Sequence, residues 1–149
     1  MTPAVPAQAC DILLVEDSSD DVFFLRRAQE RSGLELKLCH VENSLKAKDF
    51  LLAEGDYADR AGLPLPHLIV SDLKMPQWDG IELLKWVRGD SRFSKLPFIL
   101  ISSSSLERDI DAAYAAGANA YFVKPRTLPG FVHLLTEFQP YWQPRPPNP

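Results

Sequence analysis

Short apolar runs alternate along the chain with segments whose apolar residues recur at helical spacing. The first run, Ile12–Val15, is too short for a helix and suits a strand buried in a parallel sheet. His67–Asp72 and Phe98–Ser102 have the same character, and each ends in a polar residue. The pattern predicts five strands, at 12–15, 34–41, 67–72, 98–102 and 119–123.

The segments between these strands carry the start and stop signals of helices. Ser18 and Ser19 offer an N-cap for the first helix, and Gly33 ends it. Later starts are marked by capping residues: Asp79 with Glu82, Ser104 with Glu107, and Thr127. Five helices are predicted, at 19–32, 44–54, 79–89, 104–117 and 127–138.

Strict alternation of strands and helices predicts an α/β fold, with a parallel sheet and helices on both of its faces. The folded unit spans residues 10–139. Residues 1–9 are rich in Pro and Ala, and residues 140–149 are rich in Pro, so we expect both to be loosely attached tails.

Composition and charge exclude several classes of protein. The 149 residues are 46% hydrophobic and 24% charged, which fits one globular domain. A net charge of −4 gives no basic face for nucleic acid. No apolar run approaches the roughly eighteen residues of a membrane span, and residues 1–9 lack the pattern of a secretory signal. We therefore expect a cytoplasmic protein that binds neither nucleic acid nor membrane.

The two cysteines, Cys10 and Cys39, are too few for a disulfide framework, and they lack the spacing of a zinc site. We expect them to be free thiols at opposite ends of adjacent strands, with no bond between them.

Charged and polar residues follow four of the predicted strands. Ligands of open parallel sheets bind beyond the carboxyl ends of the strands. Glu16 and Asp17, Asp72, Ser102 and Lys124 should therefore meet at one edge. Crowded carboxylates favour a hard divalent cation such as Mg²⁺, an aspartate can accept a phosphoryl group, and a lysine and a hydroxyl can hold phosphoryl oxygens. The spacing alone favours Mg²⁺-assisted phosphoryl chemistry.

The sequence also resembles the receiver domains of two-component response regulators, over nearly all of residues 11–138. The motifs that carry the resemblance are Leu14–Asp17, Asp72–Pro76 with Asp79–Gly80, Ile101–Ser103 and Gly117–Pro125. The resemblance implies a flavodoxin-like receiver fold, with the strand order 2-1-3-4-5.

The resemblance implies a role for each residue at this edge. Asp72 is the expected phosphoacceptor and a metal ligand. Asp17 is the expected direct Mg²⁺ ligand, Glu16 its partner, often through water, and the backbone carbonyl of Lys74 completes the protein ligands.

Three further residues match the switch and the phosphoryl contacts of the family. Ser102 matches the catalytic-site hydroxyl that turns toward the phosphoryl group, and Tyr121 the switch aromatic that moves with it. Lys124 would contact the phosphoryl oxygens, and the resemblance implies a cis peptide between Lys124 and Pro125.

A finer resemblance is to the phytochrome-associated single-domain receivers. It rests on residues 15–21, residues 55–59 and the aromatic residues Phe138, Tyr141 and Trp142. Those receivers often dimerise through the last helices and strand. Ser103 and Ser104, together with Lys74, would flank the phosphoryl group and could alter its lifetime.

These features together predict a phosphorylation-activated switch. A sensor histidine kinase, of phytochrome type by the finer resemblance, or a histidine phosphotransfer protein would supply the phosphoryl group. The receiver would catalyse its own phosphorylation on Asp72 and a slow dephosphorylation. The face made by the fourth helix, fifth strand and fifth helix would then change and act on a downstream protein or a homodimer partner, because we expect no DNA-binding output domain.

Three alternatives remain open. A phosphate sink or phosphorelay shuttle is phosphorylated in the same way, but its change of conformation acts on no target. A pseudo-receiver is a binding module that is never phosphorylated. A small metal-dependent phosphatase with an aspartyl nucleophile typically has a second acid two residues after that nucleophile, where this chain has Lys74.

Overall fold

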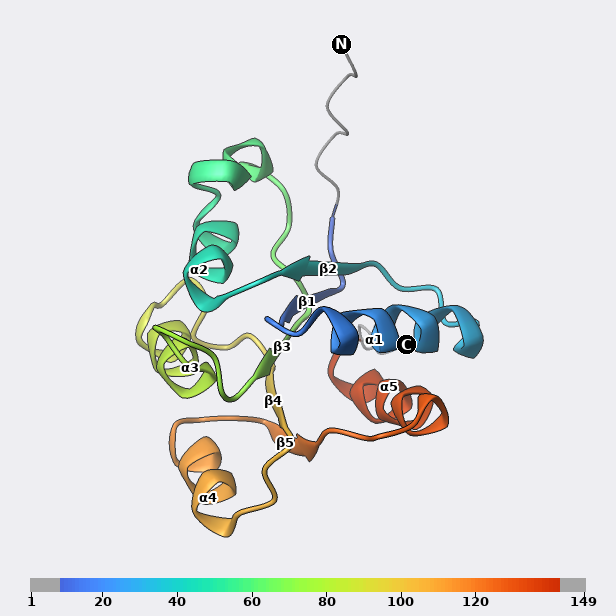
Figure 1. The fold of residues 1–149 in the computed structure, drawn as a ribbon. Coiled ribbons are helices and arrows are strands. Elements are labelled where there is room, and N and C mark those ends of the chain that lie inside the picture. Colours follow the sequence, from blue (N-terminus) through green and yellow to red (C-terminus); the bar gives the residue numbers. More distant parts are fainter. Residues whose placement is uncertain (1–8, 143–149) are drawn as a thin grey trace, which may run out of the picture.

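The sheet is parallel and five-stranded, as expected. The computed structural model describes residues 9–142, and its strand order is β2-β1-β3-β4-β5 (Figure 1). The strands are β1 (Ile12–Val15), β2 (Leu38–Val41), β3 (Leu68–Asp72), β4 (Phe98–Ser102) and β5 (Ala120–Val123).

Helices cover both faces of this sheet. α1 and α5 lie on one face, and α2, α3 and α4 lie on the other (Figure 1). Their bounds are α1 (Ser19–Ser32), α2 (Ser44–Leu52), α3 (Gly80–Gly89), α4 (Glu107–Ala115) and α5 (Leu128–Trp142), and a short 3₁₀ helix, η1 (Gly55–Arg60), follows α2. Within the described part of the chain, no helix has the length and the hydropathy needed to cross a bilayer.

The core has two halves because successive strand residues point to opposite faces. In β1, Leu13 and Val15 pack with the buried residues of α2 and α3, whereas Ile12 and Leu14 pack with those of α1 and α5. All four are essentially inaccessible to water. This two-sided burial explains why the central strands are continuous apolar runs.

Register aligns the carboxyl ends of the strands. Val15 of β1 pairs with Val41 of β2 and with Ser71 of β3. Ser102 of β4 pairs with Val123 of β5. Polar residues that end these strands are therefore brought to one edge of the sheet.

Helix caps follow the predicted signals at α1, α3 and α5. The Ser18 hydroxyl accepts from the Asp21 amide, and Gly33 ends α1 in the left-handed conformation. Asp79 and Glu82 form a complete capping box, and the Gly130 amide donates to the hydroxyl of Thr127.

The predicted capping box of α4 is wrong. α4 begins after Leu106, whose side chain makes no capping bond. The Ser104 hydroxyl instead accepts from the Leu106 amide at 3.2 Å and donates to the Asp109 carboxylate at 2.5 Å. Ser104 therefore orders the loop before the helix rather than the helix itself.

Several predicted boundaries were too wide, and α4 ends at Ala115 rather than at residue 117. β2 begins at Leu38 rather than at residue 34, because pairing with β1 starts only there. α2 ends at Leu52, where Ala53 adopts the left-handed conformation with φ 54°.

The predicted end of the last helix, by contrast, was too early. α5 continues through Pro140 to Trp142, since Phe138 and Trp142 are both buried against the sheet. The tail expected at 140–149 therefore begins with helix, and residues 1–8 and 143–149 lie outside the described residues.

The predicted cis peptide before Pro125 is also wrong. All peptide bonds across residues 9–142 are trans. The trans form is the intrinsically favoured one even before proline. Lys124 nonetheless keeps its place beside β4, because its amide donates to the Ser102 carbonyl at 2.8 Å.

Cys10 and Cys39 are free thiols, as expected, but they do not lie apart. The Cys10 thiol donates to the Ile12 carbonyl at 3.0 Å, and it lies near enough to Cys39 for each thiol to shift the pKa of the other. The Asp11 and Ile12 amides both donate to the carbonyl of Lys37, so the chain that enters β1 runs beside β2. The placement predicted from strand ends alone is wrong for this reason.

Candidate functional site

Three carboxylates meet at the carboxyl edge of the sheet. Glu16 and Asp17 follow β1, and Asp72 ends the neighbouring strand β3. One oxygen from each carboxylate lies within 4.8 Å of the other two. Glu16 and Asp72 are buried and Asp17 is exposed, so the cluster opens to solvent on one side.

Lys124 brings the compensating positive charge. Its Nζ lies 2.7 Å from Asp21 Oδ2, 3.1 Å from Glu16 Oε2 and 3.3 Å from Asp72 Oδ2. The side chain is only 12% exposed. Because Lys124 follows β5, two strands away from Asp72, its long side chain has to cross the end of β4 to reach the carboxylates.

Asp21 is the residue of this group that the sequence analysis left out. Asp21 lies in the first turn of α1, where acidic residues are common because they interact favourably with the helix dipole. Its position four residues after Asp17, on a helix that starts at the same sheet edge, is the signal that could have found it.

The electrostatics of the site follow from burial and crowding. Burial, followed by the charge of Asp72, raises the pKa of Glu16 from 4.5 to about 8. Burial also raises the pKa of Asp72, although the attraction of Lys124 opposes it. Burial alone would lower the pKa of Lys124, but its bond to Asp21 and the charges of Glu16 and Asp72 raise it instead.

The donor set fits a hard divalent cation. Glu16 Oε2 is buried and has no hydrogen-bond partner among the described residues, although Lys124 is in ion-pair contact with it. Magnesium and similar ions prefer a few carboxylate oxygens and retain several waters. The open side beside Asp17 leaves room for those waters. The Lys74 side chain is 66% exposed and lies 3.9 Å from Asp109, and the metal role of its backbone carbonyl stays a prediction.

Ser102 and Tyr121 are joined through one residue, Ser104. The hydroxyl of Ser102, which is buried at the end of β4, accepts from the Ser104 amide at 3.0 Å. The Tyr121 hydroxyl donates to the Ser104 carbonyl at 2.7 Å. The loop after β4 therefore holds both side chains by the backbone of a single residue.

The loop after Asp72 depends on a close approach at Gly80. A Cβ at Gly80 would lie 2.4 Å from the Asp72 carbonyl oxygen and 2.7 Å from Leu100. The Gly80 amide donates to the Leu73 carbonyl at 2.9 Å. Glycine here lets α3 start directly against the residue that ends β3.

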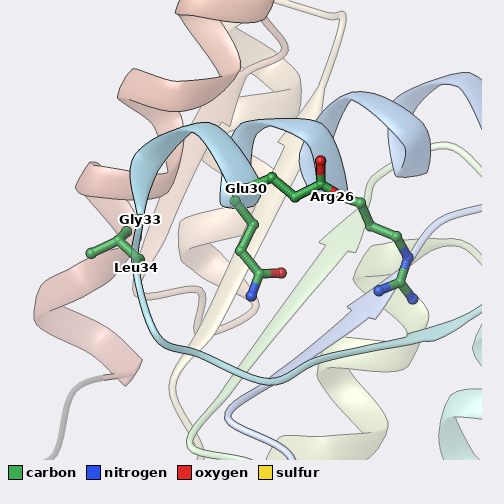
Figure 2. A pocket seen from close by; sticks show the side chains of 5 residues that line it. Arg26, Glu30, Gly33 and Leu34 are labelled. Carbon is green, nitrogen blue, oxygen red and sulfur yellow. The ribbon is translucent and has the colours of Figure 1, made fainter.

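A shallow pocket beside α1 does not belong to this site. Arg26, Gln29, Glu30, Gly33 and Leu34 line it (Figure 2). It lies at the carboxyl end of α1, whereas the carboxylate cluster lies at the start of that helix. None of the predicted site residues lines it.

Comparison with known proteins identifies the family. The model of the response regulator receiver domain matches residues 12–136, which span all five strands. The chain belongs to the response regulator receiver family. The polar residues at the carboxyl edge of this receiver therefore occupy a fold that the family shares.

Response regulator Rcp1 is similar to this receiver in sequence and in structure. Response regulator Rcp1 of Synechocystis is 30% identical over 131 residues, covering 88% of this chain and 87% of Rcp1. The structure of Mn²⁺-bound Rcp1 matches with a TM-score of 0.77 at 29% identity, over 93% of this chain and 97% of the other.

Two further solved structures are similar to this receiver. RPA3017 of R. palustris, a response regulator in red light signalling, matches with a TM-score of 0.81 at 29% identity, over 89% of this chain and 92% of the other. The bacteriophytochrome response regulator RtBRR is 34% identical with a TM-score of 0.75, over 94% and 86%. This receiver is homologous to Rcp1 and to the response regulators of bacteriophytochromes.

Proposed function

We propose that Asp72 accepts a phosphoryl group and that this modification switches a protein–protein interaction surface. The observation that carries the proposal is the cluster of Glu16, Asp17 and Asp72 with the Lys124 ammonium 3.3 Å from Asp72. Membership of the receiver family supports it. Receivers act with histidine kinases or histidine phosphotransfer proteins, and we propose a phytochrome-type kinase as the donor because the relatives include phytochrome response regulators.

The transfer step needs a nucleophile and a way to hold the phosphoryl oxygens. An Asp72 carboxylate oxygen attacks phosphorus, the N–P bond of the donor phosphohistidine breaks, and the imidazole leaves with the bonding electron pair. The Lys124 ammonium and the Ser102 hydroxyl hold phosphoryl oxygens. Ser102 ends β4 and Lys124 directly follows β5, so the edge of the sheet holds both groups near Asp72.

A divalent cation fits beside these groups, and we propose Mg²⁺. The carboxylates of Glu16, Asp17 and Asp72 and the backbone carbonyl of Lys74 would hold it. Bound there, it would neutralise the crowded carboxylates and the charge that develops on the phosphoryl oxygens. The Mn²⁺-bound form of Rcp1 supports a divalent ion in this family.

The switch follows from the contacts of Ser102 and Tyr121. When the Ser102 hydroxyl turns to the phosphoryl group, it gives up its bond from the Ser104 amide. The loop then moves and with it the acceptor of the Tyr121 hydroxyl. The face of α4, β5 and α5 changes, and a downstream protein or a second copy of the chain reads that change.

Intact-protein mass spectrometry after incubation with acetyl phosphate and Mg²⁺ tests the proposal. We expect the wild type to gain one phosphoryl group, and we expect no gain in Asp72→Asn or after chelation of the metal. If neither acetyl phosphate nor a phytochrome-type kinase modifies the folded protein, the pseudo-receiver alternative replaces this proposal.

Pull-down with and without phosphorylation separates the switch from a phosphate sink or relay shuttle. A switch captures a partner in one state only. A sink captures only histidine kinases or phosphotransfer proteins. Steady turnover of a small phosphomonoester would instead favour the phosphatase alternative, against which Lys74, two residues after Asp72, already argues.

A further inference from the structure

The closest partner of Lys124 is neither the proposed phosphoacceptor nor a proposed metal ligand. Asp21 Oδ2 lies 2.7 Å from the ammonium nitrogen, nearer than Glu16 or Asp72. The ammonium donates a hydrogen bond to Asp21 at that distance. This pair joins the first turn of α1 to the end of β5.

Asp21 is held where the lysine can reach it. Its amide donates to the Ser18 hydroxyl, the N-cap of α1. Its carboxylate is 23% exposed and the Lys124 side chain is 12% exposed. A charge-assisted hydrogen bond that is largely shielded from water is stronger than one on the open surface.

Lys124 has three N–H donors and three carboxylates around it. A phosphoryl group on Asp72 would bring further oxygens that need the same donors. The backbone of Asp21 is held in the first turn of α1, so its carboxylate stays near the ammonium. Its attraction for the lysine therefore competes with that of the phosphoryl group.

We infer that Asp21 is a positioning residue that holds Lys124 in the unphosphorylated receiver and competes with the phosphoryl group for its ammonium. The inference rests on the proposed function of Asp72 and adds a residue outside the expected site. Removing the Asp21 carboxylate should free Lys124 and strengthen binding of a phosphoryl mimic.

Beryllofluoride, a mimic of the phosphoryl group, gives a direct test in the presence of Mg²⁺. Its dissociation constant is measured by ¹⁹F NMR titration for the wild type, Asp21→Asn and Asp20→Asn. Asp20 is the matched control, because it lies in the same turn, is exposed and loses the same charge. Thermal melting followed by circular dichroism checks that each variant is folded.

We expect Asp21→Asn to bind beryllofluoride about fivefold more tightly, which corresponds to the loss of one modest charge pair. Asp20→Asn should stay within about twofold of the wild type. In a Lys124→Met background, measured at higher beryllofluoride concentration, the Asp21→Asn change should have no effect.

Three results would overturn the inference. The first is an unchanged or weaker affinity in Asp21→Asn, and the second is an equal gain in Asp20→Asn. The third is a gain that persists without Lys124, because it would reflect charge repulsion through space. If the wild type bound no beryllofluoride, the proposed function of Asp72 would fail and the inference with it. If the wild type bound it and Asp21→Asn showed no gain, only the role of Asp21 would fail.

Discussion

At the scale of single residues, Glu16 links the stability of the protein to pH. Its pKa rises from 4.5 to about 8 on folding, because it is buried beside Asp72. The folded state therefore binds a proton that the unfolded state has lost, so this residue's contribution falls as pH rises from about 4.5 to 8. Without metal, we expect Glu16→Gln to be more stable than wild type at pH 8 by more than about 1 kcal/mol.

Urea denaturation at pH 5 and pH 8 in the presence of a chelator checks this expectation. The two proteins should converge at pH 5, where Glu16 is already protonated in the folded state. Equal stability at pH 8, or a larger gap at pH 5, would contradict it.

The thiol of Cys39 provides a second residue-scale prediction. A hydrogen bond with Cys10 is the largest influence, and the charge of Arg60 adds to it, so that the Cys39 pKa falls to about 7 despite burial. The same pairing, with burial, raises the pKa of the Cys10 thiol far above its usual range. We expect alkylation of Cys39 to reach half its maximal rate near pH 7.

Mass spectrometry of iodoacetamide-treated protein across a pH series measures this midpoint. Cys10→Ala should move it toward the ordinary value for a thiol, because the hydrogen bond is lost. Cys39→Ser should leave Cys10 unlabelled in the folded protein. A midpoint that Cys10→Ala leaves in place would contradict the pairing.

At the scale of elements, the start of α3 depends on the glycine that touches β3. Gly80→Ala would put a methyl group against the Asp72 carbonyl. We expect it to lower the free energy of unfolding by about 1–3 kcal/mol, the usual cost of overpacking.

Gly89 supplies the matched control for Gly80, since it lies in the same helix and a Cβ there meets nothing within 4 Å. Urea denaturation of Gly89→Ala should give a stability within about 1 kcal/mol of wild type, the range of a glycine–alanine exchange in a helix. Similar losses in the two variants would show that the contact with Asp72 does not decide the outcome.

At the scale of the whole molecule, the face of α4, β5 and α5 is the expected site of self-association. Three apolar residues of α4, its N-cap and β5 are each about half exposed: Leu106, Tyr114 and Val123. We expect a homodimer through this face, and we expect Val123→Asp to weaken it more than tenfold because a buried unpaired charge is costly. Sedimentation equilibrium measures the effect.

Phe23→Asp is the control for that experiment. Phe23 is 62% exposed on α1, on the other side of the sheet from α4. Its substitution should leave the dimer unchanged. If the wild type is a monomer at every concentration, or if Phe23→Asp has the larger effect, another surface makes the contact.

Across the molecule, local signals predicted the elements well and long-range contacts poorly. β1 and α1 could be predicted because their signals are local. The strand is a short apolar run, and the helix begins at a capping residue that binds an amide three positions later. The start of α4 could not, because the Ser104 hydroxyl binds the Leu106 amide and Asp109 instead of capping the helix, and the capping pattern alone does not show this loop conformation.

The candidate site shows the same division. The convergence of Glu16, Asp72 and Lys124 could be predicted because strand ends of a parallel sheet meet at one edge. The sequence places Asp21 near the same edge, but its contact with Lys124 also depends on the rotation of α1 over the sheet, which the sequence pattern does not specify.

The Asp21–Lys124 contact also bears on the order of folding. It joins residues that are 103 positions apart in the chain, and closing so long a loop is entropically costly before intervening contacts have formed. Lys124 reaches its partners only after β5 has joined the sheet edge. A chain that has assembled β1 and β3 alone already brings the carboxylates together without their cation. We therefore expect the charge balance of the site to be completed only when β5 has joined the sheet.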